Sequence, residues 1–583
     1  MSDADKASRL TITTRTVGDE YYDQVLALSA HVVNDGWEKL TETYTDLQRI
    51  DLEDEDVGKL NGELLPCRIS FDGTNRAGIK VFYQIRFKSG TLQSPSGSLT
   101  QDIAGWVLTV SVAVAEQQES EMTPEQAQYI KDNFNVPGDY SVARLYADLT
   151  DARWNDMVTD RSTFGVNEDG TLITWEQWSE ANPSLKIKLN AFLATWVDYM
   201  RTRGYTTLGV KVVIPTPEEQ NPLDPTFPPT AMLHQGFRYQ NDQTPVEIAK
   251  DFDCIMYCEQ LMERPLPTRT FIADGGNWCY PESGSNPAVY GTFNISGQIF
   301  FQRKNGLLEH IRPFCRLSEI TLKDVSIFPW GMNHYFNVGY NPDHTSTEDN
   351  YFLPTIDETE FRYVWHMTHL NQNGKTIDSG RYYFCSHNSD QTVALAWKPG
   401  SNTINLSGKT TYQYASQFWR NSDKVKLDAN LEESYTATWD VPILIETNDE
   451  GRLTLVLGKH PSEVLVNVVL DYSKESNIGS RQDTIPGYMG GIQGTLQNAL
   501  LTVQNNLAQI FASTGQWVYP GNGTLYFRDP MFNNYSDVLA TVEYKPIPAG
   551  RKVQVPPPRA PPTLVPYTDS TPNEKSFSTV PNF

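Results

Sequence analysis

The sequence predicts an α+β protein, mostly antiparallel β-structure, that is built as two related halves. Much of the chain alternates apolar with polar residues, as strands do when one face of a sheet is buried. Two long segments instead repeat apolar residues every three or four positions, which is the pattern of a helix. Each of these segments is followed, after a short break, by strands. The chain has 583 residues and is too long for a single hydrophobic core, which agrees with a division into parts.

The first expected elements are a strand at 22–29 and a helix directly after it. The strand reads Tyr-Asp-Gln-Val-Leu-Ala-Leu-Ser, and Val33, Trp37 and Tyr44 follow at helical spacing. Ser29 stands where the helix needs an N-cap, because a serine hydroxyl accepts a hydrogen bond from the first turn.

Antiparallel strands are expected from Leu65 to Val114, where three runs alternate apolar and polar residues. The segment 117–180 that follows is rich in acidic residues, and we interpret it as an insertion into the N-terminal half.

The first long helix is predicted to begin at Asn182-Pro183, a capping residue followed by proline, and to end before Gly204. A strand at 207–215 follows it. Prolines crowd the segment 218–230, which we interpret as a linker between an N-terminal half, 1–217, and a C-terminal half, 231–545. The apolar face of this helix carries Leu185, Leu189, Phe192, Trp196 and Met200.

The second long helix is predicted over 491–513, inside a stretch from Thr484 to Phe527 that contains no Asp, Glu, Lys or Arg. Gln and Asn occupy its polar face, and amides are buried at a lower cost than charges. These amides also interrupt any apolar run long enough to cross a membrane. A strand, a turn and another strand are expected after the helix. Its apolar stripe includes Leu496, Leu500, Val503, Leu507 and Phe511.

Residues 291–470 read almost wholly as strands and glycine-containing turns, such as Asn373-Gly374 and Glu450-Gly451. We expect a large antiparallel sheet there. The segment 546–583 is rich in proline and lacks periodicity, which predicts an extended or poorly ordered tail. Such a tail is usually solvated, but it can also dock on a protein partner.

The composition disfavours several classes of function. The chain carries 47 Lys and Arg against 71 Asp and Glu, a net charge of −24, so its field repels nucleic acids and anionic membranes. Its start lacks the features of a secretory signal, and no transmembrane run follows. We therefore expect a cytoplasmic protein with no nucleic-acid partner. Six scattered cysteines predict buried thiols rather than a disulfide framework.

Three places in the chain share local sequence with a known superfamily. They are residues 22–29 with Val33-Asn34 after them, His234-Gln-Gly-Phe-Arg-Tyr-Gln, and Trp517-Val-Tyr-Pro-Gly leading to Asp537-Val-Leu-Ala-Thr-Val-Glu-Tyr. They resemble the TULIP superfamily, in the form of the Orf-X-type accessory proteins of clostridial neurotoxin gene clusters and their fungal relatives.

In this superfamily a curved antiparallel sheet wraps around a long helix and can enclose an apolar tunnel for lipids. The resemblance therefore implies two TULIP-like halves, each with its own helix. The negative net charge, the proline-rich tail and the segment 117–180 depart from the family pattern. These departures put membrane association and a toxin role in doubt.

The polar candidates fit ordinary structural roles better than catalytic or metal-binding ones. His366 and His369 lie three apart on an expected strand, so they face opposite sides of the sheet. Cys254 and Cys258 lack the common zinc spacing. The acidic run 51–56 lacks the order of an EF-hand loop and fits a solvated turn. No hydrolase, zinc-protease or kinase motif occurs, and we name no catalytic residue, metal or cofactor.

We expect a non-enzymatic protein that holds a lipid or another apolar small molecule in a tunnel lined by both helix stripes. Each buried CH₂ of an acyl chain would contribute about 0.8 kcal/mol to binding. Gly490 and Gly491 stand at the start of the second helix, where exposed N–H groups can receive a lipid head group. Close packing of that helix on a sheet is the stronger interpretation of these glycines.

Two alternatives stay open. Ordinary core packing also explains both stripes, and the protein would then be a structural, self-assembling or toxin-accessory-like interaction protein with a solid core. A β-rich catalytic domain within 290–470 is the third interpretation, although no nucleophile or base stands out there.

Overall fold

The computed structural model describes most of the chain between residues 3 and 546. The residues outside the description within that range are 72–79, 119–120, 134–140, 149–156, 168, 214–228, 241–243, 245, 262, 274, 283–286, 303–306, 312–319, 329–330, 339–352, 358–359, 379–380, 420–426, 448–452, 477–492, 495, 499, 502, 505–506, 508–517 and 520–522. The predicted tail therefore lies almost entirely outside the described residues.

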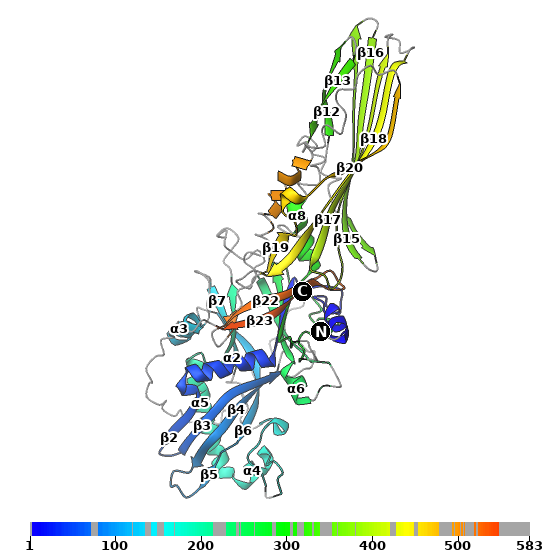
Figure 1. Ribbon diagram of the computed structural model, residues 1–583. Helices are drawn as coiled ribbons and strands as arrows, with labels where there is room; N and C mark the ends of the chain where they lie inside the picture. Colours follow the sequence, from blue (N-terminus) through cyan, green and yellow to red (C-terminus); the bar gives the residue numbers. More distant parts are fainter. Residues whose placement is uncertain are drawn as a thin grey trace.

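The molecule is elongated, with one large sheet and its helices at one end and a second long sheet extending away from them (Figure 1). Described strands pair antiparallel throughout, which confirms the mostly antiparallel β-structure that the sequence predicts; the arrangement as two TULIP-like halves stays a prediction. The described helices outside the second long helix are α1 (Asp3–Leu10), α2 (Ala30–Thr43), α3 (Pro124–Asn133), α4 (Trp175–Ala181), α5 (Pro183–Thr202), α6 (Val246–Asp251), α7 (Gly297–Gln302) and α8 (Leu307–Ile311).

The first sheet has fourteen strands in the order β2-β3-β4-β6-β7-β8-β21-β22-β23-β11-β1-β10-β9, with β5 paired to β4. It combines strands from both predicted halves. Its strands are β1 (Gln24–Ser29), β2 (Arg49–Asp54), β3 (Gly58–Phe71), β4 (Lys80–Gln93), β5 (Thr100–Asp102), β6 (Val107–Gln118), β7 (Ser141–Asp148), β8 (Thr207–Val213), β9 (Pro229–Phe237), β10 (Cys254–Leu261), β11 (Gly291–Ile295), β21 (Val518–Tyr519), β22 (Gly523–Phe532) and β23 (Val538–Pro546).

The strand order bears on the expected domain division. Strand β1 lies between β10 and β11, and β21 to β23 lie between β8 and β11. Strands from both sides of the segment 218–230 therefore hydrogen-bond to one another in one sheet, and the domain division stays a prediction. Strand β7, inside the segment 117–180, lies between β6 and β8 and is part of the same sheet.

The second sheet has seven strands in the order β14-β15-β16-β17-β18-β19, with β20 paired to β18. A separate hairpin, β12 and β13, lies beside it, with β12 in contact with β16 (Figure 1). These strands confirm the β-rich character expected for 291–470. Their bounds are β12 (Ile320–Phe328), β13 (Gly331–Val338), β14 (Leu353–Asp357), β15 (Glu360–Asp378), β16 (Arg381–Trp397), β17 (Thr403–Trp419), β18 (Leu427–Thr447), β19 (Leu453–Leu457) and β20 (Asn467–Ser476).

Local sequence explains how several elements begin and end. Strand β1 ends at Ser29, and the Ser29 hydroxyl accepts a hydrogen bond from the Val32 amide at 3.4 Å, as expected of a helix cap. Helix α5 has proline in its first turn, and Gly204 after its end has φ of +81°, a conformation that glycine adopts at little cost. Asn182 precedes α5 but makes no side-chain capping bond to it.

The acidic run 51–56 forms the end of β2 and the turn into β3. Within it Asp54 Oδ1 accepts hydrogen bonds from the amides of Asp56 and Val57 at 2.8 and 2.9 Å. Asp51 and Glu53 alternate with the buried Leu52 along β2. The predicted solvated turn is therefore limited to 55–57, and the first residues of the run belong to β2.

Candidate functional site

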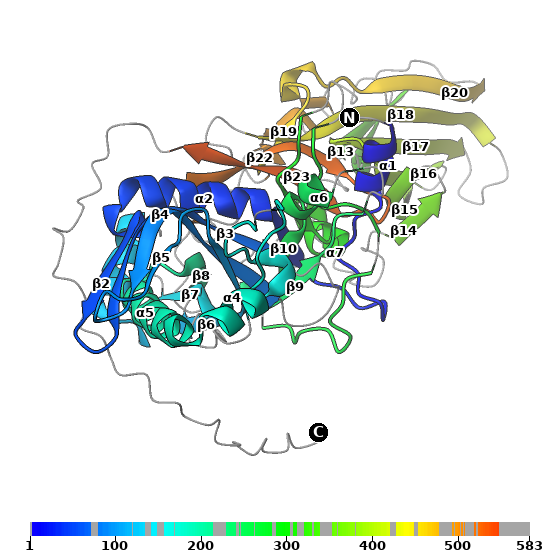
Figure 2. The ribbon, with the colours of Figure 1, turned by 90° about the horizontal axis from the view of Figure 1, so that it is seen from below.

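Helix α5 buries the whole apolar stripe that the sequence predicts. Strand β3 has one buried and one partly exposed face, and α5 contacts both β3 and β4. Its stripe belongs to the apolar cluster that includes the buried side chains of β4 and β6. In Figure 2 both α2 and α5 lie beside strands β2 to β6. The buried residues of the stripe are Leu185, Leu189, Phe192, Trp196 and Met200.

Helix α2 contributes to the same apolar cluster. The Trp37 ring lies edge-on to the Tyr83 ring of β4, with 5.6 Å between the ring centroids. The Asn34 side chain donates to the Ile69 carbonyl at 3.0 Å and accepts from the Ile69 amide at 2.7 Å. These bonds hold α2 against β3 at the point where β2 no longer pairs with it.

The end of α5 is held to the turn after α2. The Tyr199 hydroxyl donates to Asp46 Oδ2 at 2.6 Å, and the Arg203 guanidinium lies 3.8 Å from the same oxygen. Arg203 also lies over the Tyr199 ring, 5.0 Å from its centroid. The two helices that contribute to this core are therefore tied together at its rim.

Three indole N–H groups point into this core without a hydrogen-bond acceptor among the described residues. They belong to Trp37, Trp178 and Trp196, whose side chains are 1%, 4% and 3% exposed. A buried indole N–H usually finds an acceptor, because leaving it unpaired costs about 1–3 kcal/mol. The core therefore offers donors as well as apolar surface.

Burial favours the protonated, neutral form of three ionisable groups in this core. Burial raises the pKa of the Cys67 thiol to about 11 and raises the pKa of the Tyr83 hydroxyl well above its usual value. Burial also raises the pKa of Tyr205, at the rim, to about 12. A thiol and phenols that keep their protons suit an apolar lining better than nucleophilic catalysis.

The second predicted helix is present in part. Residues 493, 494, 496–498, 500, 501, 503, 504 and 507 are described as helical. Gln497 Nε2 donates to the carbonyls of Ser462 and Val464, each at 3.1 Å. Gln497 is only half-buried, and Asn498, Leu501 and Gln504 are exposed, so the amide face is partly open to solvent rather than buried as the sequence suggested. Phe511, Gly490 and Gly491 lie outside the described residues. The buried members of this stripe are Leu496, Leu500, Val503 and Leu507.

The two stripes belong to one apolar cluster but lie in different parts of the molecule (Figures 1 and 2). A cluster of aromatic side chains from α7, β16 and β22 connects the first sheet to the second. The Phe301 ring of α7 stacks on Trp397 of β16 with 4.1 Å between centroids, and Phe532 of β22 lies 5.9 Å from Phe301. The Gly400 amide donates to the Phe532 carbonyl at 2.7 Å, and the Phe532 amide donates to the Ser401 carbonyl at 2.8 Å.

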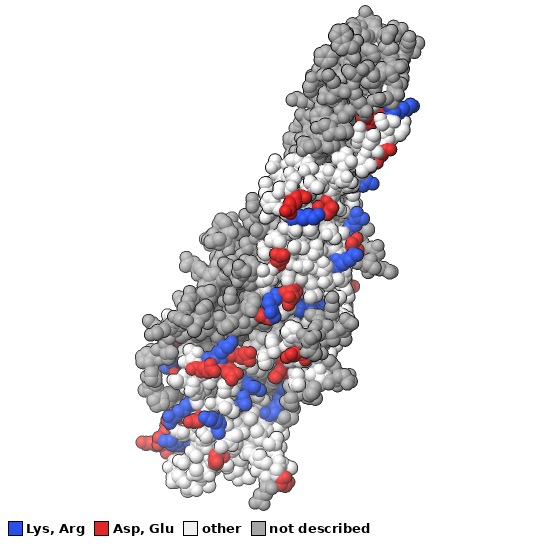
Figure 3. Space-filling view, viewed as in Figure 1, with Lys and Arg blue, Asp and Glu red and all other residues white. Residues whose placement is uncertain are grey.

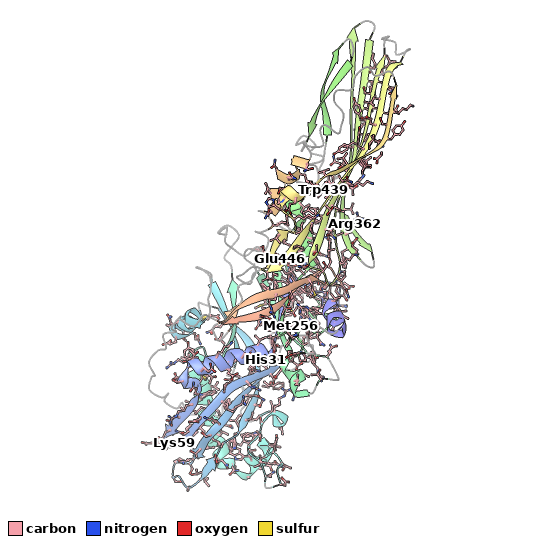
Figure 4. The ribbon with its side chains drawn as sticks, in the orientation of Figure 1. His31, Lys59, Met256, Arg362, Trp439 and Glu446 are labelled. Carbon is pink, nitrogen blue, oxygen red and sulfur yellow. The ribbon has the colours of Figure 1, made fainter. Side chains whose placement is uncertain are left out.

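An open surface pocket of about 490 Å³ lies at this junction. It differs from the helix stripes because its wall is mixed, with Glu446, Asp529 and Arg528 beside Pro530 and Met531. No sequence pattern predicts this pocket, because its residues come from three separate segments. Figure 4 shows Glu446 close to the place where the two sheets meet.

The polar candidates occupy structural positions. His366 lies on β15 and contacts Asp390 of β16 through Nε2 at 2.9 Å, and both side chains are exposed. Cys254 and Cys258 are buried free thiols on β10, and Cys67 and Cys279 are also free and buried. Among the described residues, no three His, Cys, Asp or Glu side chains come close enough to hold a metal ion.

Acidic and basic side chains are interspersed on the described part of the face shown in Figure 3. Several of them form exposed pairs, such as Lys59 with Glu53 and Arg49 with Asp51. Within the described part of the chain, no helix is both long and apolar enough to cross a membrane.

Comparison with known proteins gives structural matches only. No protein-family model and no curated protein matches the chain. P47 of Clostridium botulinum E1 aligns at 11% identity and a TM-score of 0.40, over 90% of this chain and 99% of P47. P47 of Clostridium botulinum A2 aligns at 10% identity and a TM-score of 0.37, over 89% of this chain and 96% of that P47. A lipopolysaccharide binding protein aligns at 12% identity and a TM-score of 0.31, over 90% of this chain and 99% of that protein. TM-scores of this size do not establish a shared fold.

Proposed function

We propose that this protein binds, without catalysing a reaction, an apolar small molecule with a hydrogen-bond acceptor, such as a fatty acid or another simple lipid. The observation that carries this proposal is the Trp196 indole N–H. It lies within the predicted stripe of α5, is buried in an apolar cluster, and has no acceptor among the described residues.

The surroundings of Trp196 fit such a ligand. Apolar side chains of α5, β4 and β6 supply surface for an acyl chain, and each CH₂ that leaves water contributes about 0.8 kcal/mol. A carbonyl or carboxyl oxygen would accept from the indole N–H and remove the cost of burying an unpaired donor. Cys67 and Tyr83 are neutral, so they place no charge beside the acyl chain or beside the oxygen-bearing end of the ligand.

Native mass spectrometry combined with organic extraction of the purified protein tests the proposal. We expect a lipid to co-purify at near-stoichiometric amounts. Trp196→Phe keeps an aromatic ring but removes the N–H, so it should weaken retention of the lipid roughly fivefold, the equivalent of one hydrogen bond. Trp278→Phe, the same change in the other apolar cluster, is the matched control and should leave retention unchanged.

A protein that carries no lipid and takes none from vesicles would overturn the proposal. A ligand-free oligomer in the same experiment would instead favour the structural or self-assembling alternative. Strand β20 supports that alternative, because it is an outer strand on which Val469, Leu470 and Tyr472 are about half exposed.

A further inference from the structure

One face of the seven-stranded sheet changes from apolar to polar along the same strands. Residues that pair across adjacent strands point to the same face, so the register defines rows of side chains. Close to the junction the rows are apolar and buried. Two of them are Trp397, Ile404 and Ile443, and Leu395, Leu406 and Val441, from β16, β17 and β18 in turn.

Trp439 of β18 marks the end of the apolar rows. It pairs with Gly408 of β17, which pairs with Val393 of β16. A Cβ on Gly408 would lie only 2.2 Å from the Trp439 ring, so the indole lies across β17 where glycine leaves room for it. Figure 4 shows Trp439 about midway along the long sheet.

Beyond Trp439 the same face is polar and still buried. The next row contains Gln391 and Thr410, and the row after it contains Ser389, Tyr412 and Tyr435. Ser389 and Tyr412 are fully buried and Gln391 is 1% exposed. Tyr414 and Glu433 pair in the following row, and both are buried as well.

Two of these polar groups have no hydrogen-bond partner among the described residues, namely Ser389 Oγ and Gln391 Oε1. They stand two residues apart on β16 and face the same way, so they lie about 7 Å apart along the strand. Each would cost about 1–3 kcal/mol if it stayed unpaired. The partner that they require belongs on this face of the sheet.

The side chains on this face define the chemistry of that partner. From the row of Gln391 to the row of Cys385, the positions on β15 to β18 hold two histidines, His369 and His387, and one carboxylate, Glu433, but no Lys or Arg. A phosphate or sulfate would therefore meet no permanently charged cation there. Hydroxyls and an amide supply donors and acceptors, and the tyrosine rings supply flat apolar surface, a combination that suits a neutral sugar.

We infer that the buried polar face beyond Trp439 binds a neutral carbohydrate, either a free oligosaccharide or the sugar of a glycolipid, through Ser389, Gln391 and the tyrosines beside them. This site lies on the second sheet, whereas Trp196 lies on α5, which packs on the first sheet. The carbohydrate site therefore does not depend on the lipid site proposed above.

The test is binding of the full-length protein to an array of neutral, sialylated and sulfated oligosaccharides, followed by titration with the best neutral one. We expect neutral sugars to bind. In the double variant Ser389→Ala with Gln391→Met, binding should fall at least about tenfold, because two hydrogen bonds are lost. The folded state should keep its stability, because removing polar atoms that lack partners costs little.

The matched control is Ser434→Ala with Gln413→Met, the same changes on the opposite face of β18 and β17, which should leave binding unchanged. Vesicles with and without a neutral glycolipid then separate a lipid-linked sugar from a free one. The inference is overturned if no neutral sugar binds in either format, if only anionic glycans bind, or if the Ser389 and Gln391 variant binds like the wild type. In the first case these two atoms bind ordered water only.

Discussion

At the scale of single residues, burial sets the chemistry of the core beside α5. The Cys67 thiol contacts the Tyr83 hydroxyl inside the apolar cluster, and the pKa of both groups is raised because the charged forms would lose their hydration. The predicted stripe residues were found by spacing alone, since an apolar repeat of three and four positions specifies one helix face. The sequence could not predict that the Trp196 indole N–H lacks an acceptor among the described residues, because this depends on every element packed around the ring.

Raising the pH should destabilise the protein in part through Cys67. Its pKa rises from 9.0 to about 11 on folding, so the native state keeps a proton that the unfolded state loses between these values. The stabilising contribution is therefore complete below pH 9 and is lost as the pH rises towards 11, a change of about 2–3 kcal/mol. Urea unfolding of the wild type and Cys67→Ala from pH 8 to pH 11 measures it. The pKa values of Cys254 and Cys258 are raised too, and both thiols are present in the wild type and in Cys67→Ala. If the unfolding free energy falls equally steeply with pH in the two proteins, the assignment to Cys67 is refuted.

At the scale of elements, the register of neighbouring strands determines which backbone groups need a hydrogen-bond partner from a helix. Strand β2 pairs with β3 only as far as Glu63, and β3 continues to Phe71 without it. Asn34 of α2 then bonds to both backbone groups of Ile69. The sequence predicted β1, α2 and α5 because each has its own periodicity and end signals. It did not show which strand α2 would pack on, because that depends on where β2 stops pairing.

Replacing Asn34 by alanine should therefore destabilise the protein by about 2 kcal/mol, because the amide and carbonyl of Ile69 both lose their partner. Asn34→Asp retains an acceptor for the amide but no donor for the carbonyl, so about half of the loss is expected. Chemical denaturation of the three proteins at equal pH measures these differences. A change of less than about 0.5 kcal/mol for the alanine variant, typical of a surface substitution, would show that these bonds do not hold α2 in place.

At the scale of the whole molecule, long-range pairing determines which parts of the chain fold together. The sequence suggested a division at 218–230 from proline content, a local property. Sheet order is not local, and it places β1 between β10 and β11 although more than 200 residues separate β1 from either. Every residue of β1 is buried, so both of its edges and both of its faces require the rest of the chain.

The fragment 1–217 should therefore fail to fold as a stable monomer. It would leave β1 without β10 and β11, and β8 without β21, so buried backbone groups on three strand edges would lose their partners. Size-exclusion chromatography and thermal melting followed by circular dichroism should show an aggregated or non-cooperative species, and co-expression with 218–583 should restore a folded complex. A soluble 1–217 monomer with a cooperative melting transition would show that the N-terminal half is an independent domain, and that the strands contributed by the C-terminal part only extend a sheet that is already stable.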